Sequence, residues 1–294
     1  MTLLKRGDRV GNNEIIEYIG SGRFGEVYRV KNDNFEEIAL KILKEPIAKG
    51  HEHDKWIEPY ILSKITYKNI IRVYYADIHV INYSKHRYFT MEFINGTSLL
   101  KYHLKYKLHK KFIPLKYTLD IINQICSGMK VCHDDFNVIV HKDLKPENIL
   151  ITIPDRDEMI IKITDFGLVR LPDLEYESEN IKGSLHYIPP EISSTDPRRD
   201  VYAIGVIFYQ LLTNEFPYEL NNKDDLISNH PWLKNPKPPS EINKEISKCL
   251  DDNGLDEKDI DEIVLKAISK DIDERYNNAG EFLEEIKKIE KKLN

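Results

Sequence analysis

One stretch of the chain constrains its fold and its chemistry more than any other. It reads His-Lys-Asp-Leu-Lys-Pro-Glu-Asn at residues 141–148, and Asp165-Phe166-Gly167 follows a short distance downstream. The stretch supplies a carboxylate that can accept a proton, a lysine, and two oxygen ligands for a cation. Transfer of a phosphoryl group from ATP needs these groups in this order, so the sequence predicts a phosphotransfer site.

Each residue type in this stretch has a chemical reason. Asp143 is the candidate base, because a carboxylate within hydrogen-bonding reach of a hydroxyl can orient it and accept its proton. Lys145 lies two residues further, so in an extended loop it points to the same side and can balance charge on the moving phosphoryl group. Mg²⁺ prefers hard oxygen ligands and binds one or two protein groups plus phosphates, which Asn148 and Asp165 supply together. The predicted reaction therefore needs positioning and charge neutralisation, with no covalent intermediate.

A glycine-rich hexapeptide near the start of the chain matches the pattern G-x-G-x-x-G. It consists of Gly20, Ser21, Gly22, Arg23, Phe24 and Gly25. The pattern alone is shared by phosphate-binding hairpins and dinucleotide-binding turns, and the latter open a helix after the third glycine. Residues 26–30, which include Val27, alternate like a strand instead. We therefore predict a β-hairpin over phosphates, where missing Cβ atoms let backbone N–H groups approach the phosphate oxygens.

Length and composition limit what else the chain can be. Its 294 residues suit one catalytic domain without a further module. The formal charge of −6 argues against a nucleic-acid binder, and the three cysteines predict neither a disulfide framework nor a zinc site. The first residues lack a signal-peptide core, and no apolar run reaches the roughly 18 residues that span a bilayer. We expect a soluble, cytoplasmic protein that does not contact a membrane.

From about Tyr18 to Ile289 the chain resembles the eukaryotic-type Ser/Thr protein kinase superfamily, bacterial members above all. Asp-Leu-Lys-Pro-Glu-Asn is the form that Ser/Thr-directed members carry. The resemblance implies one kinase domain over residues 1–294 with a two-lobed α+β fold, in which a small β-rich N-lobe covers about residues 1–93 and a larger, mostly helical C-lobe about residues 94–294. It implies ATP and Mg²⁺ as cofactors and protein substrates, the chain itself among them, and it allows a homodimer of kinase domains.

The resemblance also assigns the nucleotide-binding side chains. In the strand over residues 38–43, Ala39 and Lys41 share one face, which sets a small residue against the adenine and a cation toward the α- and β-phosphates. A solvated strand lysine is the alternative. Glu58 matches the position of the glutamate that pairs with Lys41, but Pro59 follows it and proline is tolerated only in the first turn of a helix. The helix is therefore expected to begin at or just before Glu58.

Residues 88–94 resemble the strand and connector between the lobes. Met91 would guard the inner pocket, and the backbone groups of Glu92 and Ile94 would bind the adenine edge. Because backbone atoms make these bonds, side-chain identity is a weak test, and an ordinary core strand is the alternative.

The second half of the chain carries structural motifs of the same family. Apolar spacing predicts a helix over residues 115–133 with Cys126 and Cys132 packed in it. Residues 183–191 are similar to the family's substrate-docking end, with Glu191 as an ion-pair partner of Arg275. Residues 200–205 match the start of the central buried helix, which holds the catalytic loop in place.

Two charged segments have two interpretations each. Lys142 replaces the arginine usual before the catalytic aspartate and cannot form a bidentate fork to a phosphate. Residues 175–179, Glu-Tyr-Glu-Ser-Glu, either supply fixed carboxylates near Lys142 and so give basal activity, or form a solvated acidic loop. The lysine-rich residues 101–111 either recruit an acidic substrate or form a solvated helix face.

Two rival functions remain open at this point. An inactive nucleotide-binding pseudokinase scaffold is disfavoured because it usually lacks one of Lys41, Asp143, Asn148 and Asp165, which are all present. A small-molecule phosphotransferase of kinase-like fold would lack the docking segment at residues 183–191.

Overall fold

The computed structural model describes most of the chain. The described residues are 2–22, 24–51, 56–134, 138–152, 158–166, 185–191, 195–219, 225, 232, 234–251 and 256–293. Predictions for Arg23, Gly167, residues 175–179 and residues 183–184 therefore lie outside the described residues. The chain divides into two compact units, residues 1–66 with 70–95 and residues 67–69 with 96–294.

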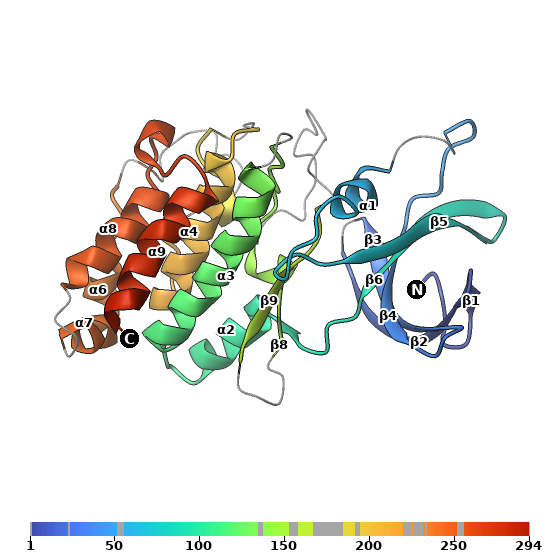
Figure 1. Ribbon diagram of the computed structural model, residues 1–294, viewed down its shortest axis with the longest axis horizontal. Helices are drawn as coiled ribbons and strands as arrows, with labels where there is room; N and C mark the ends of the chain where they lie inside the picture. Colours follow the sequence, from blue (N-terminus) through green and yellow to red (C-terminus); the bar gives the residue numbers. More distant parts are fainter. Residues whose placement is uncertain are drawn as a thin grey trace. The chain divides into compact units, whose positions relative to one another are not determined.

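The first unit is a six-stranded antiparallel sheet with one short helix, α1 (Figure 1). The strand order is β1-β2-β3-β4-β6-β5. The strands are β1 (Arg9–Val10), β2 (Asn13–Ser21), β3 (Gly25–Asn32), β4 (Glu37–Leu43), β5 (Val73–Ile81) and β6 (Ser84–Glu92), and α1 covers Ile57–Leu62. The predicted hairpin around the glycine-rich segment is the β2–β3 pair.

The register of this sheet sets which side chains share a face. Val27 on β3 lies opposite Lys41 on β4, and Ala39 lies opposite Met91 on β6. Because side chains alternate along a strand, Ala39 and Lys41 point to the same face, as predicted, and Val27 shares that face. The other face of β4 packs Leu40 into a core with partners that share deep burial: Val10, Ile15, Tyr28, Val30, Ile42 and Tyr88.

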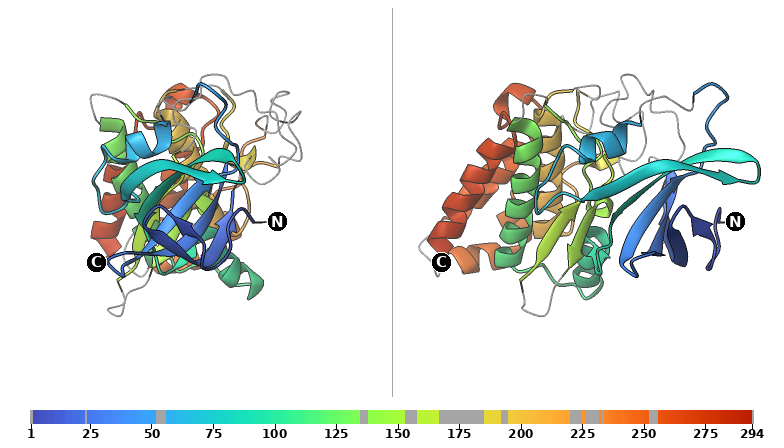
Figure 2. Two further views of the ribbon diagram at one scale, coloured as in Figure 1. Left: turned by 90° about the vertical axis from the view of Figure 1, so that its right-hand side faces the viewer. Right: turned by 45° about the vertical axis from the view of Figure 1, so that its right-hand side comes forward.

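The second unit is mostly helical. Its helices are α2 (Leu99–Leu108), α3 (Leu115–Asp134), α4 (Arg198–Thr213), α6 (Pro239–Ile242), α7 (Lys244–Asp251), α8 (Glu257–Ala267) and α9 (Ala279–Leu293). Short 3₁₀ turns are η1 (Pro146–Asn148), η2 (Leu185–Tyr187) and η4 (Ile272–Glu274), and β7 (Thr97–Ser98), β8 (Ile149–Thr152) and β9 (Ile160–Ile163) form a small sheet. Helix α3 packs against α4 and α9, and α8 packs against the same two helices, as the right-hand view of Figure 2 shows for α3, α4 and α9.

Two helices of this unit match their predictions closely. Helix α3 buries one face, with Cys126 and Cys132 inside it. Every side chain of α4 from Arg199 to Thr213 is buried, so α4 is the central helix that the sequence indicated. Within the described residues, no helix is both long and apolar enough to cross a membrane.

The division of the chain differs from the predicted lobe boundary at residues 67–69. These residues were expected in the small lobe, but they group with the second unit. The side-chain Nδ2 of Asn69 donates to Gln124 Oε1 at 2.9 Å and to the Ile161 carbonyl at 3.0 Å. The backbone carbonyl of Asn69 accepts from the backbone N–H of Ile163 at 2.8 Å. These bonds fasten the segment to α3 and β9.

Candidate active site

The loop that ends in η1 brings together three of the predicted site residues. Lys145 Nζ donates to Asp143 Oδ1 at 2.9 Å and to Oδ2 at 2.7 Å. Asn148 Nδ2 donates to the Asp143 carbonyl at 2.8 Å and to Oδ2 at 3.0 Å. Since charge-assisted bonds are the stronger kind, the Asp143 carboxylate is oriented from two sides while its side chain stays 22% exposed. It is both fixed and reachable by a hydroxyl.

A buried carboxylate fixes the backbone of this loop. Asp200 on α4 accepts from the His141 amide at 2.7 Å and from the Lys142 amide at 3.0 Å. Burial alone raises the pKa of Asp200, but the hydrogen bonds from His133 and the His141 amide outweigh it and hold this pKa below its usual value. Asp200 therefore stays ionised and holds the peptide bonds that precede Asp143.

Lys142 adopts a left-handed conformation, with φ of 68°. A non-glycine residue in this region is uncommon and persists where the surroundings hold it. Here the bond from its amide to Asp200 does so, and it turns the chain between His141 and Asp143.

The ring of His141 links the loop to the strand end that carries Asp165. Its Nδ1 accepts from the Asp143 amide at 3.3 Å, so Nε2 carries the proton and donates to the Thr164 carbonyl at 3.0 Å. The His141 ring lies 4.5 Å from that of the fully buried Phe166. The ring of His141 on the loop and the ring of Phe166 on the downstream segment thus hold the two segments together.

Strand pairing brings the two candidate metal ligands to the same end of a hairpin. Ile149 on β8 lies opposite Ile163 on β9, and the Thr164 amide donates to the Asn148 carbonyl at 2.9 Å. Asn148 and Asp165 therefore flank the last paired residues of the two strands. Asp165 has φ of 70°, which aspartate tolerates better than most residues.

The donor set at this hairpin end fits a hard cation such as Mg²⁺. The amide nitrogen of Asn148 is engaged by Asp143, so its oxygen is the group that would serve as a ligand, together with a carboxylate oxygen of Asp165. Among the described residues, no group of three or more His, Cys, Asp or Glu side chains could hold a metal ion. A cation here would take its remaining ligands from water and phosphate oxygens.

In the first unit, the predicted ion pair between Lys41 and Glu58 is present. Lys41 Nζ lies 2.8 Å from Oε1 and 2.9 Å from Oε2 of Glu58, and the two side chains are 9% and 6% exposed. The ammonium also lies 5.6 Å from the ring centroid of Phe89. Lys41 is therefore a buried, paired lysine, and the solvated alternative is excluded.

The three glycines of the hairpin have different surroundings. A Cβ on Gly25 would lie 2.6 Å from the Ile42 carbonyl oxygen, so close pairing with β4 already requires glycine there. A Cβ on Gly20 or Gly22 would meet nothing within 4 Å. The prediction gave one reason for all three; for Gly25 the structure adds a packing reason, and the space around Gly20 and Gly22 is open.

Part of the backbone of the predicted adenine-binding segment already forms hydrogen bonds within the protein. The Glu92 amide donates to the Arg72 carbonyl at 2.9 Å, and Glu92 Oε1 accepts from the Arg72 amide at 2.8 Å. Only the carbonyl of Glu92 could then contribute to the predicted contact. Ile94 follows the end of β6 in irregular backbone.

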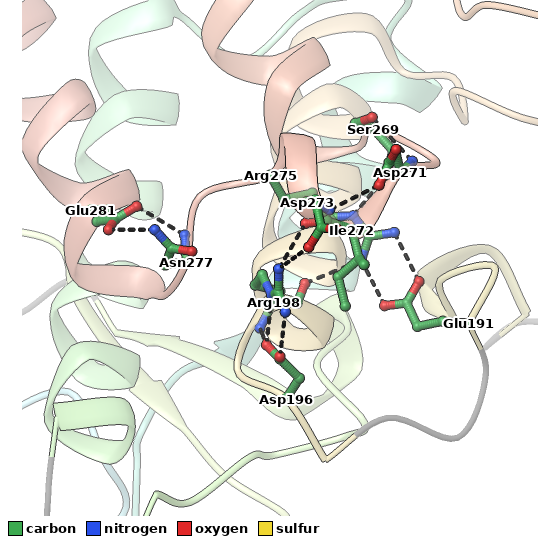
Figure 3. Close-up of polar contacts among 10 residues, drawn as sticks. All are labelled: Glu191, Asp196, Arg198, Ser269, Asp271, Ile272, Asp273, Arg275, Asn277 and Glu281. Atoms are coloured by element: carbon green, nitrogen blue, oxygen red, sulfur yellow. Dashed lines mark hydrogen bonds and ion pairs between the residues drawn. The ribbon is translucent and has the colours of Figure 1, made fainter.

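The predicted ion pair between Glu191 and Arg275 is bidentate, with Nη1–Oε1 at 2.7 Å and Nη2–Oε2 at 2.9 Å (Figure 3). The Arg275 side chain is completely buried, its Nε donates to the Ser269 carbonyl at 2.7 Å, and its guanidinium lies 4.9 Å from the Tyr202 ring centroid. The pair ties Glu191, at the end of the segment predicted to dock substrates, to η4 and α4.

Sequence reasoning missed two residues that support this framework. His133 Nε2 donates to Asp200 at 3.1 Å, while its Nδ1 accepts from the Ala279 amide at 3.1 Å. Arg198 binds Asp196 through Nη2 at 2.8 Å and Asp273 through Nη1 at 2.7 Å (Figure 3). The sequence offered one hint for His133, because it is a titratable residue within a helix that was predicted to bury one face. It offered no hint for Arg198.

Comparison with known proteins agrees with this geometry. Residues 13–288 match the family described as protein kinase domain. The chain is 29% identical to serine/threonine-protein kinase PrkC of Bacillus subtilis, over 96% of this chain and 41% of that protein. It is 32% identical to aurora kinase C of Mus musculus, over 74% of this chain and 75% of that protein.

A probable serine/threonine-protein kinase of Clostridium perfringens is 27% identical over 98% of this chain, which spans 40% of that protein. The chain thus spans about two fifths of the length of several bacterial relatives. Among solved structures, the kinase domain of PknI from Mycobacterium tuberculosis matches with a TM-score of 0.67 at 18% identity, over 97% of this chain and 99% of that domain. That likeness supports the two-lobed α+β protein kinase fold.

Proposed function

The chain belongs to the protein kinase family, and we propose that it transfers the γ-phosphate of ATP to serine or threonine hydroxyls of proteins, itself among them. One observation carries the proposal above the others: Lys145 and Asn148 both donate to the carboxylate of Asp143 within a loop that Asp200 holds rigid. Pre-positioned groups of this kind are what phosphoryl transfer requires of a protein.

Each residue of the loop has a separate task in the proposed reaction. Asp143 orients the acceptor hydroxyl and takes its proton. Lys145 balances negative charge on the transferred group, and its bonds to Asp143 place that charge beside the base. Asn148 keeps the carboxylate in one rotamer.

ATP and a divalent cation are the cofactors that family membership implies, and we propose Mg²⁺ as the cation. When bound with nucleotide phosphates, Mg²⁺ neutralises charge that develops on the phosphate oxygens. Asn148 and Asp165 would hold it, and the first unit would hold the nucleotide phosphates with Lys41 and the glycine-rich hairpin. Because Glu58 already orients the Lys41 ammonium, little ordering remains to be done when phosphates bind.

The acceptor class and the setting follow from sequence and relatives. Lys145 lies in the Asp-Leu-Lys-Pro-Glu-Asn form that Ser/Thr-directed kinases carry, and several relatives are named serine/threonine-protein kinases. We propose the cytoplasm as the place of action, since ATP and Mg²⁺ are supplied there. Modification of one copy by another would need a homodimer, at least during transfer.

The first experiment is transfer of radiolabelled phosphate from ATP in the presence of Mg²⁺, with the protein itself and a generic basic protein as acceptors. The variant Asp143→Asn should abolish labelling of Ser and Thr, and the matched variant Asp134→Asn, at an exposed position near the end of α3, should not. Label on Ser or Thr that survives in Asp143→Asn would overturn the assignment. Binding of ATP without any transfer by the wild type would instead support the scaffold alternative.

A further inference from the structure

A long stretch of one-sided charge surrounds α2. Residues 93–119 contain no aspartate or glutamate, although the whole chain has a formal charge of −6. The same stretch contains six lysines: Lys101, Lys105, Lys107, Lys110, Lys111 and Lys116. A local excess of positive charge on an acidic protein calls for an explanation beyond solubility.

The inner side of α2 is anchored. His103 is buried and its Nε2 lies 2.8 Å from Asn214 Oδ1. Lys107 Nζ donates to the Asn214 carbonyl at 2.7 Å, and Asn214 Nδ2 donates to the Lys111 carbonyl at 3.1 Å. Asn214, the left-handed residue that ends α4, therefore fixes both α2 and the turn after it, so the outer side of α2 is presented on a rigid support.

The outer side of α2 combines apolar and cationic groups. Leu104 and Leu108 are 40% and 81% exposed and lie four residues apart, on one face of the helix. Lys101, Lys105 and Lys111 are exposed, and within the described residues no carboxylate forms an ion pair with any of the three. Their charges are available to a partner.

A hollow of about 580 Å³ lies beside these lysines. Its lining includes three tyrosines, two of the lysines and one histidine, namely Tyr102, Tyr106, Tyr117, Lys105, Lys111 and His109. The rings of Tyr102 and Tyr106 lie 5.4 Å apart. Burial raises the pKa of Tyr102, so its hydroxyl stays protonated and neutral at physiological pH. Aromatic walls with a cationic rim suit a ligand that is both apolar and acidic.

We propose that this α2 basic surface, formed by Leu104, Leu108 and the lining of the hollow, docks an acidic segment of protein substrates that also carries apolar side chains. The position of α2 supports this role, because α2 packs against η1, the turn that ends at Asn148. A segment held on α2 would keep the substrate chain beside the catalytic loop. The use of the surface for substrates rests on the proposed kinase activity; the binding itself does not.

Single-stranded nucleic acid is the other polyanion that lysines and aromatic rings can bind. The net charge of −6 disfavours it, since a nucleic-acid binder presents a strongly basic footprint. The two exposed leucines also match a peptide better than a phosphate backbone. A short single-stranded oligonucleotide therefore enters the test as a competitor.

The first arm of the test measures binding without catalysis. The probe is a fluorescent peptide with the sequence of residues 173–179, Asp-Leu-Glu-Tyr-Glu-Ser-Glu, beside a peptide in which the four carboxylates are replaced by amides. Fluorescence anisotropy with the Asp143→Asn protein, without nucleotide, should show binding of the acidic peptide alone, weakening as salt is added. Lys105→Glu/Lys111→Glu should weaken it about tenfold.

The matched control is Lys244→Glu/Lys248→Glu, which makes the same change of charge on two exposed lysines of α7. It should leave the affinity within about twofold, because neither lysine lines the hollow and salt screens the longer-range effect of exposed charges. Equal weakening by both double variants, equal binding of the amide peptide, or tighter binding of the oligonucleotide through the same lysines would each overturn the proposal.

The second arm measures transfer to one acceptor peptide with and without the acidic segment attached. The segment should lower KM for the peptide with the wild type and the Lys244→Glu/Lys248→Glu control, and lose this effect in Lys105→Glu/Lys111→Glu, with KM for ATP unchanged. An acidic segment that leaves KM for the peptide unchanged in the wild type would refute substrate docking. If no phosphate is transferred at all, the proposed kinase function fails, and the binding arm still decides whether the surface exists.

Discussion

The Nζ atom of Lys41 lies within 2.9 Å of both carboxylate oxygens of Glu58, in an environment that leaves less than a tenth of either side chain exposed. Pro59 directly after Glu58 does not prevent this contact, because α1 begins at Ile57 and Pro59 falls in its first turn. Backbone N–H groups in the first turn have no acceptor within the helix, so the missing N–H of a proline breaks no helical hydrogen bond there. The proline sets where the helix begins and thereby places the glutamate.

The first prediction concerns this pair. Glu58→Gln should lower the free energy of unfolding by about 3–5 kcal/mol, because it leaves the buried Lys41 charge uncompensated. The double variant Lys41→Met/Glu58→Met should cost less, although both variants should lose phosphotransfer. Chemical denaturation checks this. The control is Glu37→Gln, which removes one partner of the exposed pair between Arg29 and Glu37 and should leave the free energy of unfolding nearly unchanged. A double variant less stable than Glu58→Gln would contradict the role of the buried charge.

The second prediction concerns the proposed metal ligands, Asn148 and Asp165. Asp165→Ala should reduce phosphotransfer by about 10²–10⁴-fold, as expected when a group that holds the charge-neutralising cation is removed. Asn148→Ala should raise the Mg²⁺ concentration needed for half-maximal activity, and it should also lower kcat because Asp143 loses a hydrogen bond. A chelator should stop transfer in the wild type, and added Mg²⁺ should restore it. Unchanged Mg²⁺ dependence in Asn148→Ala would remove that residue from the metal site.

The parts of the fold that the sequence predicted well depend on short-range patterns. Alternation over residues 38–43 gave β4 and the face of Lys41, and helical spacing over residues 115–133 gave α3. The arrangement of the candidate catalytic loop could be predicted because Asp143, Lys145 and Asn148 lie within six residues, so that one turn brings them together. Local spacing is sufficient where the chain itself makes the contact.

Contacts between distant segments were not readable in the same way. Asn69 binds Gln124 and His133 binds Asp200, and in each case the sequence shows two polar residues with no sign that they meet. The reason for glycine at position 25 is the Ile42 carbonyl on the neighbouring strand. Such requirements arise from tertiary packing, which local spacing in the sequence does not reveal. The pair of Glu191 and Arg275 was anticipated only through resemblance.

The third prediction concerns Arg275. Arg275→Lys should lower the thermal unfolding temperature markedly, because a lysine cannot reproduce the two parallel bonds to Glu191 together with the bond to the Ser269 carbonyl. The control is Arg198→Lys. Arg198 also makes two parallel bonds, to Asp196, but it is partly exposed and its partners Asp196 and Asp273 are 32% and 83% exposed. This change should therefore lower the free energy of unfolding by about 1 kcal/mol or less. If Arg198→Lys destabilised the protein as much as Arg275→Lys or more, burial would not explain the different contributions of the two arginines to stability.

The fourth prediction concerns residues 175–179, which lie outside the described residues. The double variant Tyr176→Phe/Ser178→Ala should keep basal phosphotransfer, because the three glutamates of that segment supply fixed negative charge without modification. Replacement of all three glutamates by glutamine should lower the activity. An inactive Tyr176→Phe/Ser178→Ala protein would show that a phosphate is required there.

The last prediction concerns pH and Asp200. Its pKa is lowered in the folded protein from an ordinary value of 3.8, so the unfolded chain binds a proton at Asp200 more readily than the folded one. The stabilisation from this carboxylate should be complete above about pH 5 and should decline as the pH falls through 3.8 toward the lowered folded value. Asp200→Asn removes this dependence on pH and leaves buried donors poorly satisfied, which costs about 1–3 kcal/mol for each one.

Chemical denaturation between about pH 3 and pH 7 tests this. Above about pH 5 the gap in free energy of unfolding between the wild type and Asp200→Asn should be constant, and it should narrow as the pH falls further. The exposed variant Asp134→Asn should show no such narrowing. A gap that widens as the pH falls would mean that the folded pKa of Asp200 is raised, and its bonds to the His141 and Lys142 amides would not then be those of a carboxylate.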